Sequence, residues 1–146
     1  MNEKKIETLR WIDDHFEMID QRVLPSEFSY ISYNSAKSVA DGIRSMVVRG
    51  APAIGCAAAY GVALEAIKIQ SLNKEDFLSG MRDACKILLE SRPTAINLFW
   101  AVNRMQLIIK DNHNIAPREL AMILLEEAHK ISTEDIKINR MMGGFG

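Results

Sequence analysis

The chain has 146 residues, and its 18 Lys and Arg against 19 Asp and Glu give a formal net charge of −1. This length corresponds to about one domain and suffices for a hydrophobic core. Hydrophobic residues make up 48% and charged residues 25% of the sequence, which excludes a disordered chain, a collagen-like repeat and a disulfide scaffold. The near-neutral charge argues against a strongly basic nucleic-acid-binding domain, so we expect no nucleic-acid partner.

The distribution of apolar residues predicts neither a signal peptide nor a membrane-spanning helix. No apolar run follows Met1–Lys5, so we expect no signal peptide. The longest uncharged and mostly apolar stretch is Ala51–Leu64, which is shorter than the ~20 residues that span a bilayer. We therefore expect no membrane association and a cytoplasmic location.

The first third of the chain, residues 1–33, predicts a small antiparallel sheet. Two short apolar segments, Thr8–Ile12 and Phe16–Asp20, flank the polar linker Asp13–His15, as in a hairpin. A third candidate strand is Phe28–Ile31. These short segments predict a sheet of three strands at the start of the chain.

From Ser35 onward the apolar residues recur with the period of an α-helix. We expect an α+β fold in which the sheet leads into a bundle of about five helices over residues 35–142, the whole chain being one domain, 1–146. The expected helices start at the N-cap Ser35, run over about Ala53–Gln70, start at the N-cap Asn73, run over Thr94–Lys110 behind Pro93, and run from Pro117 to about Met142 with a bend near Ser132–Thr133. The second is apolar all round, which is typical of the centre of a bundle.

The cysteines and histidines do not form a recognisable reactive or metal-binding pattern. Cys56 and Cys85 are too few for a disulfide framework, and we expect both as reduced core residues. Cys56 is also conceivable as a nucleophile, but no base lies near it in sequence. His15, His113 and His129 lack metal-ligand spacing, so we expect no metal site.

Two places along the chain share one design, an arginine directly before a proline at an expected helix start. These are Arg49–Pro52, with Gly50 removing side-chain bulk, and Ser91–Thr94, which contains Arg92. A helix N-terminus presents unpaired N–H groups, and arginine matches phosphate or carboxylate with a planar donor fork. We expect the two corners to converge on one phosphate. The alternative is that each arginine caps a helix or pairs with a surface acid. Asn97 and Asn103 either satisfy buried backbone or line a cleft.

Four segments that occur in order carry a resemblance to a known family: Leu9–Trp11, Asp20–Pro25, Met46–Gly55 and Ser91–Leu98. Together they resemble the N-terminal domain of the S-methyl-5-thioribose-1-phosphate isomerases, whose superfamily includes the regulatory subunits of the translation-initiation exchange factor. The resemblance covers essentially the whole chain. It implies an aldose–ketose isomerase of methionine salvage that acts on S-methyl-5-thioribose 1-phosphate.

The resemblance also implies which residues bind the substrate and what else takes part. Arg49, Gly50, Ala51 and Arg92 match the family positions that bind the phosphorylated thio-sugar, chiefly its phosphate. No metal or organic cofactor is expected, and the family typically forms homodimers. These are the same two corners that the charge pattern selects.

This chain departs from the family at its end. A Rossmann-like domain follows in family members and carries the catalytic cysteine and aspartate, to which neither Cys56 nor Cys85 corresponds. The glycine-rich residues Gly143–Gly146 are either a frayed tail or a turn into further sequence. We expect an N-terminal half without catalytic residues, truncated or completed by a C-terminal half. The alternatives are a related deoxypentose- or ribose-phosphate isomerase and a non-catalytic interaction module like the exchange-factor regulatory subunits.

Overall fold

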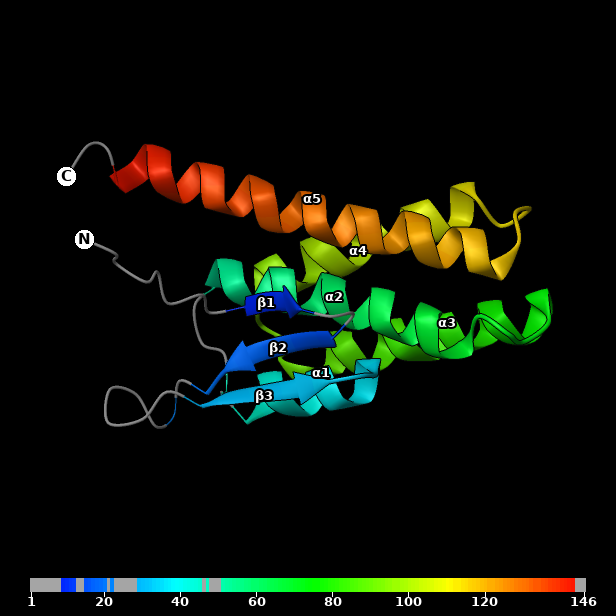
Figure 1. Ribbon diagram of the computed structural model, residues 1–146, viewed down its shortest axis with the longest axis horizontal. Coiled ribbons are helices and arrows are strands. Elements are labelled where there is room, and N and C mark those ends of the chain that lie inside the picture. The colour runs from blue at the N-terminus through cyan, green and yellow to red at the C-terminus, as the bar shows by residue number, and fades with distance from the viewer. Residues whose placement is uncertain are drawn as a thin grey trace.

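The computed structural model describes residues 9–12, 15–20, 22, 29–45, 47 and 51–143, with side chains in the last helix described as far as Glu134. Within this part of the chain a three-stranded sheet precedes five helices (Figure 1), which confirms the expected α+β fold. The elements are β1 (Leu9–Ile12), β2 (His15–Ile19), β3 (Tyr30–Tyr33), α1 (Ala36–Arg44), α2 (Ala51–Ile69), α3 (Lys74–Ser91), α4 (Ile96–Asp111) and α5 (Pro117–Gly143).

The sheet is an antiparallel meander in the order β1-β2-β3. His15 was expected in the linker, but it pairs with Ile12 and begins β2, so the second strand lies one residue earlier than predicted. The third strand lies two residues later than its predicted range. Phe16 and Met18 are fully buried on one face of β2, whereas Glu17 between them accepts a hydrogen bond from Arg10 at 2.7 Å. This alternation places the core on one side of the sheet.

Helix α2 is the central element of the fold, as its all-round apolar sequence predicts. It packs against each of the other four helices. A Cβ added at Gly61 would lie 3.0 Å from a methyl group of Leu88 on α3, so the small residue allows close approach of these helices. By length and composition α2 could cross a membrane, but 67% of its apolar window is buried inside the fold. That burial is typical of a core helix.

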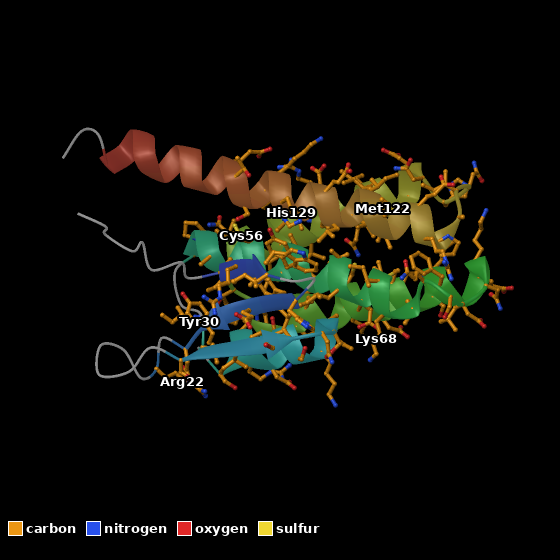
Figure 2. All side chains as sticks on the ribbon, viewed as in Figure 1. Arg22, Tyr30, Cys56, Lys68, Met122 and His129 are labelled. Carbon is orange, nitrogen blue, oxygen red and sulfur yellow. The ribbon has the colours of Figure 1, made fainter. Side chains whose placement is uncertain are left out.

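An aromatic cluster joins the sheet to α2 and α5. The Tyr60 ring of α2 stacks on Phe16 at 4.6 Å and on Trp11 at 5.9 Å between centroids. Its hydroxyl lies 2.6 Å from Nδ1 of His129 on α5 (Figure 2). Burial raises the pKa of Tyr60 to about 12 and lowers the pKa of His129, so both groups are neutral near pH 7. His129, which the sequence left without a role, is therefore a packing residue.

Both cysteines are buried and unbridged, as expected. The Cys56 thiol faces the Ile131 carbonyl oxygen of α5 at 4.0 Å, and Figure 2 shows Cys56 near the beginning of α2. Burial raises the pKa of Cys85 to about 12, which keeps its thiol protonated. Cys85 therefore lacks the lowered pKa that a cysteine nucleophile requires.

Candidate anion-binding site at two helix N-termini

The N-terminus of α1 is satisfied by groups of the chain itself. The Ser35 side chain accepts a hydrogen bond from the Ser38 backbone N–H at 3.1 Å, in a capping box. The Glu65 carboxylate, on α2, accepts from the Ala36 N–H at 3.1 Å. A helix N-terminus carries about half a positive charge, and here a carboxylate from another helix neutralises it.

Helices α3 and α5 also begin with acidic or capping groups. The Asn73 side chain accepts from the Asp76 N–H at 2.8 Å, and Glu75 and Asp76 lie in the first turn of α3. Helix α5 has Glu119 in its first turn. These three helices therefore have an acidic group or a cap where the dipole favours one.

Helices α2 and α4 contrast with α3 and α5. Neither has an acidic residue in its first turn. The N-cap of α4 is Ala95, which provides no side-chain hydrogen bond. The first N–H groups of an α-helix have no partner within the helix. The start of α4 is therefore electropositive and offers backbone N–H groups that can donate to a ligand.

The beginning of α4 lies against α2 just after the first turn of α2. A Cβ at Gly55 would be 3.0 Å from the Asn97 carbonyl oxygen and 3.4 Å from the Asn97 Cβ. Asn97, whose role the sequence did not decide, is half-buried at the second position of α4. Its side chain therefore lies beside this contact. Arg104 fixes α4 on α5 through Glu127 at 2.5 Å and Glu134 at 2.9 Å. The contact between Gly55 and Asn97 therefore places the beginnings of α2 and α4 side by side.

Arg92 precedes α4, but a turn separates it from the helix, which the sequence did not predict. The expectation that Pro93 starts the helix is wrong, because α4 begins at Ile96. The Ala95 N–H donates to the Arg92 carbonyl at 3.0 Å, so Pro93 occupies the second position of a turn, which its fixed φ suits. Arg92 is the half-buried C-cap of α3. No described side chain forms an ion pair or hydrogen bond with its guanidinium.

Comparison with known proteins identifies the family. The model of the Initiation factor 2 subunit family, IF-2B, matches residues 47–146. The chain belongs to this family. The matched residues begin just before α2 and include all of α2 to α5, so both helix N-termini of the candidate site lie within the family's shared region.

Relatives within the IF-2B family include enzymes. Methylthioribose-1-phosphate isomerase of Albidiferax ferrireducens is 52% identical over 97% of this chain and 40% of its own length. 5-Deoxyribose 1-phosphate isomerase of Bacillus cereus is 45% identical over 97% of this chain and 41% of its own length. The crystal structure of 5-methylthioribose 1-phosphate isomerase from Pyrococcus horikoshii matches with a TM-score of 0.91 and 40% identity, over 97% of this chain and 40% of that one. The chain spans about 40% of the length of these relatives.

The predicted site residues are located unevenly. Ala51 is the exposed first residue of α2, and Arg92 precedes the turn into α4. Arg49 and Gly50 lie outside the described residues, so the pairing of two arginines on one anion stays a prediction. Two features were not predicted from the sequence: the Glu65 carboxylate at the start of α1 and the missing side-chain cap at Ala95. Glu65 is conspicuous in the sequence as the one acidic residue of the apolar helix α2, but the sequence does not indicate its partner Ala36.

Proposed function

We propose that residues 1–146 are the N-terminal, phosphate-binding domain of a cytoplasmic sugar-phosphate isomerase that converts S-methyl-5-thioribose 1-phosphate to S-methyl-5-thioribulose 1-phosphate in methionine salvage. The observation that supports this most is the contact of two helix N-termini that lack acidic groups. A phosphate dianion would take the place that Glu65 holds at α1. Relatives named for a pentose 1-phosphate substrate agree with such a ligand.

In this proposal the chain binds and orients the substrate. The N–H groups at the starts of α2 and α4 donate to phosphate oxygens. Arg92 supplies charge-assisted hydrogen bonds from the α4 side, and Arg49 does so from the α2 side. Gly50 and Ala51 keep the approach free of bulk. Holding the phosphate fixes the sugar, so that acid and base groups can act on its first two carbons.

The acid and base groups are proposed to come from polypeptide outside these 146 residues. Relatives extend well beyond the matched part, and the surface near the α4 start is suited to being covered. Ile96 is 80% exposed and Trp100 54% exposed, and large apolar side chains that are exposed close together mark interaction surfaces. We propose that a C-terminal half packs here and that the complete enzyme is a homodimer. No metal, organic cofactor, nucleic acid or membrane takes part.

A second candidate substrate is 5-deoxyribose 1-phosphate, favoured by the relative from Bacillus cereus. The phosphate would bind in the same way, and the sugars differ in the substituent on carbon 5. Comparing the affinities and turnover of both sugars in the enzyme completed with a C-terminal half separates these candidates. Turnover by the 146 residues alone would contradict the division of labour proposed here.

The main test is phosphate binding by the 146-residue chain and by Arg92→Ala. Loss of a hydrogen bond to a charged group costs about 1.5–3 kcal/mol, so we expect roughly a 10- to 150-fold loss of affinity for the sugar phosphate in calorimetric titrations. Arg44→Ala is the matched control, because Arg44 is an exposed partner of Asp41 at the end of α1. The family description also fits an interaction module. Negligible binding by the parent chain and by both variants would favour that function.

A further inference from the structure

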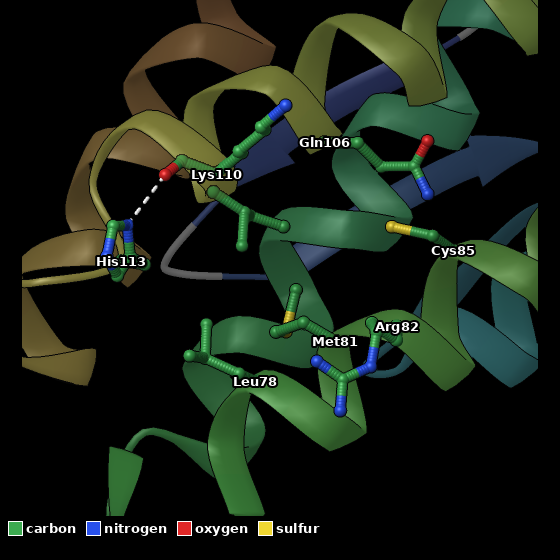
Figure 3. Close-up of a pocket in the computed structure, with 8 residues that line it drawn as sticks. Leu78, Met81, Arg82, Cys85, Gln106, Lys110 and His113 are labelled. Carbon is green, nitrogen blue, oxygen red and sulfur yellow. Dashed lines mark hydrogen bonds between the residues drawn. The ribbon is translucent and has the colours of Figure 1, made fainter. Parts of the chain in front are cut away.

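A cavity of about 330 Å³ lies between α3 and the second half of α4 (Figure 3). Its floor is apolar and is formed by Leu78, Met81, Cys85 and Ile109. Met81 and Cys85 are each 1% exposed, so the floor reaches the core. Figure 3 shows the Cys85 sulfur directed toward the space between the helices. This volume lies at the small end of the range of ligand pockets.

The Cys85 thiol contributes an apolar wall, not a reactive group. Burial raises the pKa of this thiol to about 12, so the thiolate that would attack an electrophile is not formed near neutral pH. A protonated thiol packs as a small hydrophobic group. The floor therefore suits a hydrocarbon or aryl surface.

The mouth of the cavity is basic. Arg82 on α3 and Lys110 on α4 belong to the lining, together with His113 and the amide side chain of Gln106. Figure 3 shows the Arg82 and Lys110 side chains on different sides of the cavity. The His113 Nδ1–H donates to the Lys110 carbonyl at 2.9 Å, which holds the imidazole at the mouth. No acidic side chain belongs to the lining. Neither Arg82 nor Lys110 forms an ion pair within the part of the chain that the structure describes.

We propose that this cavity binds a small amphipathic anion, an apolar body that carries one carboxylate. Transfer of the apolar body onto the floor provides the main favourable free energy, at about 25 cal/mol per Å² removed from water. The carboxylate stays at the surface of the cavity, where Arg82 and Lys110, two exposed cations of the lining, attract it without a competing acid. An uncharged ligand would gain the first contribution and lose the second.

This cavity is separate from the proposed phosphate site. Along α4, Gln106 lies ten residues beyond Ile96, a distance of roughly 15 Å at 1.5 Å per residue. Because α3 and α4 are connected by a turn at Arg92–Ala95, the phosphate site lies at that turn and the cavity toward the far ends of the two helices. Both ligands can therefore bind at once.

Octanoate is a suitable probe, and 1-octanol is its uncharged counterpart of equal chain length. The readout is the methyl resonance of Met81 in the 146-residue chain labelled with 13C-methyl methionine and assigned with Met81→Leu. We expect a saturable shift of this resonance with octanoate. Because an exposed ion pair is worth up to about 1 kcal/mol, two of them predict roughly threefold to 30-fold weaker binding of octanol.

The charge variants locate the carboxylate. Arg82→Gln combined with Lys110→Gln should reduce octanoate affinity to that of octanol and leave phosphate binding unchanged. Lys86→Gln, one turn along α3 and outside the lining, is the matched control and should bind octanoate like the parent chain. Absence of a saturable Met81 shift, equal affinities for octanoate and octanol, or an unchanged octanoate affinity in the double variant would each overturn the proposal.

Discussion

The N-termini of α1 and α4 face the same electrostatic demand and meet it differently. At α1, a serine cap and the Glu65 carboxylate occupy the first N–H groups. At α4, the N-cap is an alanine, the first turn has no acid, and the nearest charged residue in sequence is the cation Arg92. Each favourable charge at a helix end stabilises by about 0.3–1 kcal/mol. The start of α4 lacks that stabilisation, which agrees with the proposal that this helix end binds an anion.

The largest effect on folding is expected where the two electropositive helix starts touch. Gly55→Ala places a Cβ 3.0 Å from the Asn97 backbone carbonyl, which cannot rotate away. Overpacking costs about 1–3 kcal/mol and exceeds the gain of up to about 1 kcal/mol in helix propensity. Urea unfolding should show lower stability, and phosphate titration should show weaker binding because α4 is displaced.

Gly80→Ala is the control for this substitution. Its Cβ would meet Ile69 Cδ1 at 2.6 Å, but that atom is the end of a flexible side chain. We expect unchanged or higher stability and unchanged phosphate affinity. A Gly55→Ala protein as stable as Gly80→Ala would show that the α2 and α4 starts are not held together as described.

Removal of the α1 cap should affect stability alone. Ser35→Ala deletes the acceptor of the Ser38 N–H, and loss of such a cap typically costs about 1 kcal/mol. Urea unfolding measures this change. Phosphate affinity should be that of the parent chain, because α1 carries its own anion and takes no part in the site. A marked loss of phosphate binding in Ser35→Ala would remove the distinction between the two helix ends.

A smaller effect is expected when the internal carboxylate is neutralised. Glu65→Gln keeps an oxygen that can accept from the Ala36 N–H but removes the negative charge. We expect a loss of about 0.3–1 kcal/mol in unfolding free energy, diminished at high salt because screening weakens the charge at the helix end. Equal stability of the parent and Glu65→Gln at low salt would contradict the role assigned to the carboxylate.

The fold followed from local patterns more readily than the site did. Apolar periodicity located the five helices, and two short apolar segments on either side of a polar linker indicated the first two strands. The start of α4 was misplaced because Pro93 suits the first turn of a helix and the second position of a turn equally well, and the Arg92–Ala95 hydrogen bond decides between them. Glu65 could not be assigned because it acts on a residue 29 positions earlier, a contact created by packing.

The candidate site residues were predicted from a charge pattern together with a family resemblance, and their role in binding stays a prediction. Arginine before proline selected Arg92 as a cation near a helix start. Arg92 still lies near the start of α4, although that helix begins at Ile96. What the sequence could not indicate is that α2 and α4 touch through Gly55 and Asn97, because this depends on how the helices pack. The missing side-chain cap at Ala95 is notable because side chains cap both α1 and α3.

The most direct test of an α4 start reserved for an anion is Ala95→Asp, measured by urea unfolding and by phosphate titration of the same protein. The φ of −83° and ψ of 103° at Ala95 suit an N-cap. We expect stability to rise by about 0.5–2 kcal/mol, while phosphate affinity falls roughly two- to fivefold because a carboxylate, worth about 0.3–1 kcal/mol there, now occupies the helix end. Ala95→Ser, which caps without charge, should bind phosphate more tightly than Ala95→Asp. Phosphate affinity equal in the parent chain and Ala95→Asp would contradict the account.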